Sequence, residues 1–246
     1  MNKLTILLLL VVSFFLTGCL DVIEEMYLNR DGSGKYSVTI DMSGLFEDEF
    51  MKSMIKSSLE QDTTLKLSGG DGGGLPEMDT IIYFKDMPSE QMGGNPDFWK
   101  RVHSKIVMSE EKSQFFTSIN LDFASTADIA YLYENIGKIG ESNSQLGGLT
   151  GDGGFLPTNV GYTLAKNLLT RKTPKPAEKT EEGEDMEMMK MFLGSANHRI
   201  IYHLPGNVKK VTIPNAKTNG KTVTIEAALI DIMDGKANMD CTIKFK

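Results

Sequence analysis

The feature that most constrains the fold is a repeated alternation of apolar and polar residues in short runs. Tyr36, Val38 and Ile40 alternate with polar residues, and the run 239–245 alternates in the same way. Successive side chains of a β-strand point to opposite faces, so each run presents one apolar face. The chain can bury these faces only by assembling its strands into a sheet that is covered on one side.

Turn residues separate these runs. The segment 29–34, Asn-Arg-Asp-Gly-Ser-Gly, has turn chemistry. Asn219-Gly220 is a strong hairpin signal, and we expect it to join strands over 208–213 and 222–228. The other expected strands cover 21–29, 35–42, 80–84, 101–108, 114–123, 198–204 and 236–246.

Two longer segments have helical character. Ser43 is a suitable N-cap, and apolar side chains recur at helical spacing over 44–59. Ser125-Thr126-Ala127-Asp128 resembles a capping box and opens a second helix, with Ile129, Leu132, Tyr133 and Ile136 on one face. Shorter helical turns are expected over 96–99 and 186–193.

The sequence therefore predicts an α+β fold, in which helices pack on one face of an antiparallel β-sheet. We expect a single domain over residues 19–246, with long Gly-rich and acidic loops. The polar, proline-bearing segment at about 171–185 cannot bury a core, so a disordered acidic insertion is expected there. A separate sheet-forming subdomain after that segment is the alternative.

The first nineteen residues have the order of a secretory signal. A positive start at Asn2-Lys3 precedes an apolar run over 4–15, which is short of the ~20 residues that span a membrane. The residues Leu16-Thr17-Gly18-Cys19 resemble the lipobox of bacterial lipoproteins. That resemblance implies a signal peptide over 1–18, lipid attachment at Cys19, and acylation of the new amino terminus by a fatty acid such as palmitate. An ordinary secretory signal with an incidental cysteine is the alternative.

Charge and cysteine content limit the partners. Removal of residues 1–18 takes away Lys3 alone among the charged residues and lowers the net charge from −7 to −8. An acidic protein repels nucleic acid, so we expect no nucleic-acid partner, and membrane contact through the lipid. With Cys19 acylated, Cys241 has no partner in the chain. We interpret Cys241 as a small buried residue, since a redox thiol would need a basic neighbour that the local sequence does not supply.

Three features together are similar to the LppM-like bacterial lipoproteins. They are the lipobox followed at once by a strand, the hairpin around 29–36, and the turn Tyr202-His203-Leu204-Pro205-Gly206 before the closing strands. The resemblance implies an antiparallel α+β fold and a role in envelope lipid handling, without a catalytic residue set. By this resemblance Cys19 is the lipid attachment site, and Gly34, Pro205 and Gly206 are turn formers.

No arrangement of residues in the sequence indicates catalysis or metal binding. His198 and His203 are five apart on an expected strand and therefore point to opposite faces, and neither they nor His103 have zinc-site spacing. The loop at Asp31 has a methionine, Met42, where a calcium loop needs a glutamate. The glycines over 69–74 lack a phosphate-loop lysine, and no nucleophile elbow is present. We therefore expect no enzyme, no catalytic residue, no metal and no cofactor.

A methionine cluster, with Met186, Met188, Met189 and Met191, remains open to two interpretations. Thioethers bind Cu(I), and methionine-rich faces bind apolar partners. The alternative is a short helix that packs its apolar residues against the core.

The sequence thus predicts a non-enzymatic, membrane-anchored lipoprotein of the cell envelope that binds an envelope lipid or a protein partner. We favour the outer membrane, with the periplasmic and surface-facing sides both open. This hypothesis predicts an apolar groove between the helix 44–59 and the sheet. A structural or assembly lipoprotein without a ligand cavity and an unrecognised hydrolase are the alternatives.

Overall fold

The computed structural model describes residues 20–47, 77–87, 95–142, 160–173 and 193–246, together with positions 49, 52, 53 and 57. Its strands are β1 Asp21–Leu28, β2 Gly34–Asp41, β3 Met78–Tyr83, β4 Val102–Ser109, β5 Gln114–Phe123, β6 Gly161–Ala165, β7 Leu168–Lys172, β8 Asn197–His203, β9 Val208–Val211, β10 Lys217–Asn219, β11 Thr222–Ala228 and β12 Cys241–Phe245. Its α-helices are α3 Pro96–Trp99, α4 Ala127–Ser142 and α7 Leu229–Met233, and its 3-10 helices are η1 Ser43–Glu47, η3 Phe84–Asp86 and η5 Leu193–Ser195.

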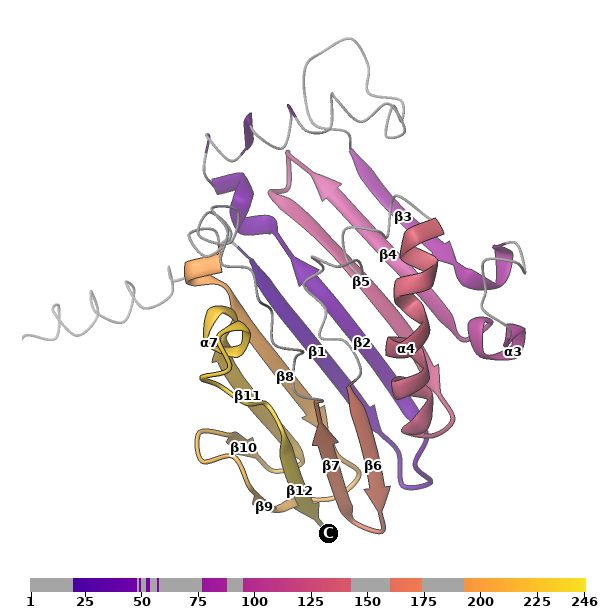
Figure 1. Ribbon diagram of the computed structural model, residues 1–246, viewed down its shortest axis with the longest axis vertical. Helices are drawn as coiled ribbons and strands as arrows, with labels where there is room; N and C mark the ends of the chain where they lie inside the picture. The colour runs from indigo at the N-terminus through magenta and orange to yellow at the C-terminus, as the bar shows by residue number, and fades with distance from the viewer. Residues whose placement is uncertain are drawn as a thin grey trace, which may run out of the picture.

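The strands form two sheets (Figure 1). The large sheet has eight strands in the order β10-β11-β8-β1-β2-β5-β4-β3, and the small sheet has four in the order β6-β7-β12-β9. In the view of Figure 1 the small sheet lies in front of the lower part of the large one. Apolar side chains from both sheets and from α4 belong to one buried core.

Strand β1 is central in the large sheet. It pairs antiparallel with β2 over its whole length, and parallel with β8 from Asp21 opposite Asn197 to Tyr27 opposite His203. The expected antiparallel arrangement therefore holds for most strand pairs of the structure, but not for β1 and β8, and the large sheet is mixed. The strands after residue 196 are divided between both sheets, so they do not form the separate subdomain considered as an alternative.

The α+β class agrees with the structure, but the expected layer of helices over one face is not clearly present. Helix α4 contacts β5 and β6, and the other described helices have five residues or fewer. The predicted inward residues of α4, Ile129, Leu132, Tyr133 and Ile136, are all buried. Of the helix expected over 44–59, the described part begins as η1, and most of the remainder lies outside the described residues.

The predicted hairpins have the expected turns but not always the expected arms. The hairpins β1–β2 and β4–β5 agree with the prediction. At Asn219-Gly220 the arms are β10 and β11, whereas β9 pairs with β12 in the small sheet. The pairing of 208–213 with 222–228 was wrong because the loop over 212–216 moves the chain from one sheet to the other.

The first residues of the acidic insertion expected at about 171–185 are ordered in a strand. Arg171 and Lys172 belong to β7, and the backbone N–H of Thr173 donates to Asp240 at 2.7 Å. Arg171 is almost fully buried because it pairs with a buried carboxylate of the other sheet. The rest of the predicted insertion, 174–185, lies outside the described residues.

Two glycines are required by close packing. A Cβ atom at Gly34 would overlap the carbonyl oxygen of Tyr27 and the ring of Phe123, and one at Gly206 would overlap the backbone of Lys246. Neither glycine has a positive φ, whereas Gly32 and Gly220 do. The role of Gly34 is thus close packing rather than the turn formation that the resemblance implied.

Within the described residues, no helix is both long and apolar enough to cross a membrane.

Candidate functional site

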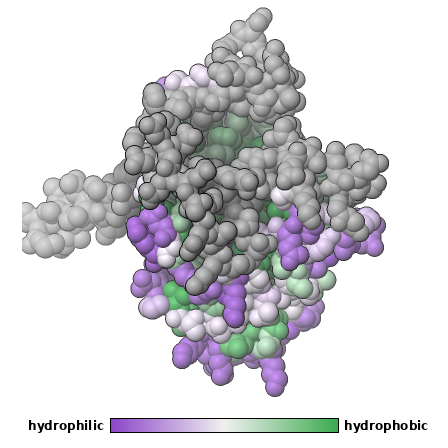
Figure 2. All heavy atoms as spheres, viewed as in Figure 1, coloured by the Kyte–Doolittle hydropathy of each residue, from purple (hydrophilic) through white to green (hydrophobic). Residues whose placement is uncertain are grey.

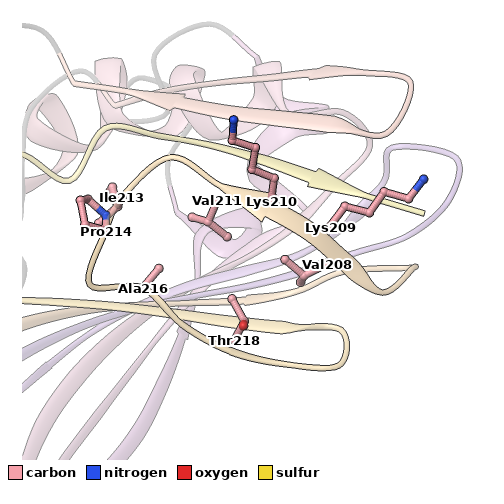
Figure 3. A pocket seen from close by; sticks show the side chains of 8 residues that line it. All are labelled: Val208, Lys209, Lys210, Val211, Ile213, Pro214, Ala216 and Thr218. Carbon is pink, nitrogen blue, oxygen red and sulfur yellow. The ribbon is translucent and has the colours of Figure 1, made fainter.

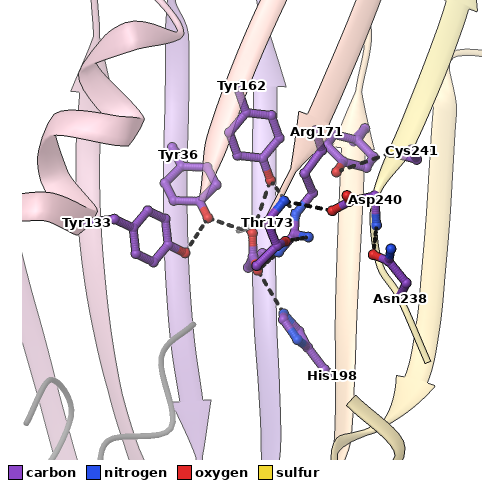
Figure 4. A network of polar contacts seen from close by, with 11 residues as sticks. Tyr36, Tyr133, Tyr162, Arg171, Thr173, His198, Asn238, Asp240 and Cys241 are labelled. Atoms are coloured by element: carbon purple, nitrogen blue, oxygen red, sulfur yellow. Dashed lines mark hydrogen bonds and ion pairs between the residues drawn. The ribbon is translucent and has the colours of Figure 1, made fainter. Parts of the chain in front are cut away.

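A buried carboxylate lies at the centre of the interface between the two sheets. Glu24, on the inner face of β1, has no exposed surface. Its Oε1 accepts hydrogen bonds from Arg171 Nη2 at 2.9 Å and from His198 Nε2 at 2.8 Å. Its Oε2 accepts from the hydroxyls of Tyr36 at 2.6 Å and Tyr162 at 3.0 Å (Figure 4). Each carboxylate oxygen therefore has two donors.

Strand register explains how these residues meet. On β1 and its neighbours β2 and β8, Glu24 lies opposite Val38 and Ile200, so Tyr36 and His198, each two positions away, share its face. The small sheet supplies the other two donors. Tyr162 of β6 and Arg171 of β7 are direct cross-strand partners and therefore point the same way.

The cluster continues outward from these donors. Tyr36 donates its proton to Glu24, so the hydroxyl of Tyr133 on α4, 2.7 Å away, donates to Tyr36. Arg171 also donates from Nε to the Tyr162 hydroxyl at 3.2 Å and from Nη1 to Thr173 at 2.7 Å. One chain of hydrogen bonds thus links α4, the large sheet and the small sheet (Figure 4).

The electrostatics of the cluster favour an ion pair. Burial alone would raise the pKa of Glu24, but the Arg171 guanidinium and the hydrogen bonds from His198 and Tyr36 outweigh it and hold that pKa well below its usual range. Burial alone would lower the pKa of Arg171, and the Glu24 carboxylate instead raises it. Burial raises the pKa of Tyr36, Tyr133 and Tyr162, which therefore stay neutral donors.

This arrangement is suited to holding the sheets together. Burying a charge costs several kcal/mol unless it is paired and hydrogen-bonded, and here both conditions are met. The carboxylate has no acceptor position left for a substrate proton, and the side chains of Arg171 and Glu24 are 1% and 0% exposed. The cluster therefore acts as a polar bridge between the sheets.

A second feature is an open hollow beside β9, the edge strand of the small sheet. It has a volume of about 290 Å³ and lies between β9 and β10. Figure 3 shows Val208, Val211, Ala216 and Thr218 around it, while Lys209 and Lys210 extend away from its centre. The lining of the hollow thus combines apolar side chains with polar groups, and lysines border it.

The sequence-predicted residues lie in several places. Cys19 is outside the described residues, but the next residue, Leu20, is buried and β1 begins at Asp21. Cys241 is buried, its thiol lies 3.7 Å from the Tyr202 hydroxyl, and burial raises its pKa, in agreement with its interpretation as a core residue. The apolar groove expected beside helix 44–59 and the cluster Met186–Met191 lie outside the described residues.

The three histidines do not come together. His198 points inward to Glu24 and His203 outward to Glu25, as their spacing predicted, while His103 lies on β4 beside Tyr83. No group of three or more His, Cys, Asp or Glu side chains in the described part of the chain could hold a metal ion.

Sequence reasoning missed both charged residues of the buried cluster. Glu24 occupies an inward position of an otherwise apolar face, between Val22 and Met26. Arg171 likewise occupies an inward position of β7, two residues after the buried Leu169. A charged residue at an inward position of an alternating strand was the available signal, and two such residues of opposite sign indicate a pair.

Comparisons with known proteins found one distant similarity. No family model matches the chain, and no curated protein matches it. Among solved structures, the NMR structure of the folded domain of LppM from Mycobacterium tuberculosis is similar, with a TM-score of 0.40 and 9% sequence identity over 93% of this chain and 90% of that chain. This is a distant likeness of fold and extends to no activity, ligand or location.

Proposed function

We propose that this chain is a non-enzymatic lipoprotein of the cell envelope, anchored through Cys19, that binds a lipid or protein component of the envelope. The observation that carries the proposal is the position of the lipobox cysteine directly before the central strand. Leu20 is buried and Asp21 is already paired with Asp41 of β2. The signal peptide ends where the folded core begins.

The anchor would hold the folded body close to the bilayer. Two residues of extended chain reach at most about 7 Å, so Asp21 lies within that distance of the acylated cysteine. Because β1 has neighbours on both sides, a force on the anchor is transmitted to the middle of the sheet. This geometry suits a body held at a fixed distance from a membrane. The outer membrane is the favoured location.

A binding role, not catalysis, fits the charged residues best. The buried Glu24 is saturated with donors, and its partners are buried with it. On the surface, the rings of Tyr27 and His203 stack on each other, and both side chains form hydrogen bonds with Glu25. An assembly lipoprotein without a ligand is the second candidate, favoured by the filled interface around Glu24.

Mass analysis of the mature N-terminus tests the anchor. The wild-type protein, extracted with detergent, is expected to begin at Cys19 and to carry acyl groups, and the variant Cys19→Ser is expected to lose both the acyl mass and membrane association. Cys241→Ser is the matched control, because it removes the other cysteine of the chain and leaves the lipobox intact. An unmodified N-terminus in the wild-type protein would overturn the proposal.

A further inference from the structure

Both sheets end in an edge strand at the same end of the molecule. Strand β9 is the last strand of the small sheet and β10 is the last strand of the large one. The hollow of about 290 Å³ lies between these two edges. Alternate residues of an edge strand direct their backbone N–H and C=O groups away from the sheet, and these groups can pair with another chain.

This end of the protein is basic, although the chain as a whole is acidic. The segments 160–173, 204–225 and 241–246, which include the small sheet, the hollow and the first residues of β11, contain eight lysines and one arginine but no aspartate or glutamate. The arginine is Arg171, which is paired inside. All eight lysines are exposed. Figure 2 shows hydrophilic residues around hydrophobic ones at this end of the viewed face.

Few of these lysines have an acidic partner. Lys217 lies 3.8 Å from Glu226, which is shared with Arg199. Within the described residues, no ion pair involves Lys209, Lys210 or Lys244. Lys210 and Lys244 are direct cross-strand partners, and like charges in that position destabilise a sheet. The fold by itself gains nothing from this pair.

The hollow contains apolar side chains as well as lysines at its border. Val208, Val211, Ile213, Pro214 and Ala216 line it. A polymer that carries only anionic groups would leave these side chains unused. A protein segment in extended conformation offers backbone groups for the edge of β9, an apolar side chain for the hollow and carboxylates for the lysines.

The anchor membrane is a poor match for this surface. Strand β8 runs parallel to β1, and Thr218 of the hollow is level with Val223 of β11, Tyr202 of β8 and Met26 of β1, so the hollow lies beside the Tyr27 end of β1. The five residue steps from Asp21 to Met26 span about 17 Å, which separates this level from the end of β1 that follows Cys19.

We propose that the hollow between β9 and β10 binds an extended, acidic segment of a protein partner, which pairs with the edge of β9, places an apolar side chain between Val208 and Val211, and meets Lys209 and Lys210 with its carboxylates. The inference deepens the proposed binding role and rests on it, but does not depend on acylation of Cys19. It names a protein segment rather than a lipid as the bound component.

The test uses the full mature lipoprotein in a neutral detergent and a dye-labelled octapeptide of alternating glutamate and valine. Fluorescence anisotropy is expected to show saturable binding that weakens as the ionic strength is raised from ~0.05 to ~0.5 M. The double variant Lys209→Glu/Lys210→Glu is expected to raise Kd by about tenfold or more. Lys85→Glu/Lys112→Glu, the same charge change on exposed lysines near β3 and β4, is expected to leave Kd unchanged.

Two further peptides separate the contribution of charge to binding from that of the strand hydrogen bonds. A peptide with alternating lysine and valine is expected not to bind, because its charges match those of the surface. An alternating glutamate–valine peptide methylated on the backbone nitrogens of every second residue is expected to bind at least tenfold more weakly, because it cannot form the strand hydrogen bonds.

Several outcomes would overturn the proposal. Equal losses in both double variants would show a general charge effect. Binding to anionic phospholipid vesicles but not to the peptide would make this end a membrane contact. Failure to bind either probe would leave the lysines as protection of an edge strand against aggregation. Because acylation is measured separately as a mass on Cys19, none of these outcomes is confused with failure of the anchor.

Discussion

The two faces of the small sheet hold positive charge in opposite ways. Arg171 points inward, is nearly without exposed surface, and meets a carboxylate that has four donors. Its neighbour Lys172 points outward, and the lysines of β9 and β12 stand in solvent. The inner charge is satisfied by the fold, whereas Lys210 and Lys244 oppose each other across two strands. The difference separates charge that holds the protein together from charge that is available to a partner.

The largest change in the free energy of unfolding is expected from breaking the buried ion pair between Glu24 and Arg171. Arg171→Met leaves Glu24 buried without its cation and should lower the free energy of unfolding by about 3–5 kcal/mol. Urea denaturation of the detergent-extracted protein measures this loss. The double variant Glu24→Gln/Arg171→Met should lose less than the sum of the single losses, because it leaves no unpaired charge. Strict additivity would show that the two side chains are not coupled.

Acid should weaken the same pair. The pKa of Glu24 lies below its ordinary value of 4.5 in the folded protein, so its contribution to stability is fully present above that value and is lost as the pH falls below it. The free energy of unfolding of the wild type should therefore decline from about pH 5 downward. Glu24→Gln should show a shallower decline, with a remainder from carboxylates such as Asp128, whose pKa is also lowered. Parallel profiles for the two proteins would argue against a charged Glu24 in the folded state.

Substitutions of two glycines test the same contrast between tightly packed and open parts of the molecule. Gly34→Ala would force its methyl group against the backbone of Tyr27 and the ring of Phe123, and should cost about 1–3 kcal/mol. Gly194→Ala, in η5, meets no atom within 4 Å and serves as the control, with a change within about 0.5 kcal/mol. Thermal denaturation compares the two, and similar effects would contradict the packing argument.

The smallest change in the free energy of unfolding is expected on the outer face of the small sheet, and this change is an increase. Lys210→Glu replaces a like-charge pair with an attractive one opposite Lys244, and should raise the free energy of unfolding by about 0.2–1 kcal/mol. The same substitution should weaken binding of the acidic peptide. Lys85→Glu, on η3, provides the stability control. A loss of stability in Lys210→Glu would show that this lysine has a structural partner.

Much of the local structure could be predicted from the sequence. The bounds of β5 are those expected, because its ends carry clear turn residues. Met239, just before β12, and Cys241 and Ile243 within it are buried as the alternation over 239–245 predicted. The opposite orientations of His198 and His203 also follow from period two alone. These features depend on neighbours in the chain, and local sequence contains that information.

Strand pairing and the candidate sites could not be predicted in this way. Alternation shows which face of a strand is buried but not which strand lies beside it, so the parallel pair β1–β8 and the transfer of β9 to the small sheet were missed. Arg171 was assigned to a solvated insertion, since its neighbours over 172–185 are polar and its partner Glu24 is 147 residues away.

The sequence by itself determined the acidic net charge, the lipobox-like motif, most strands of the large sheet and the alternation of inward and outward positions along each predicted strand, because these follow from composition and from the geometry of an extended backbone. Only the tertiary structure decided that a glutamate and an arginine from different sheets share one buried site, and that two edge strands enclose a hollow bordered by lysines. Both depend on which segments distant in the chain pack together, and that choice depends on the total burial of the folded core.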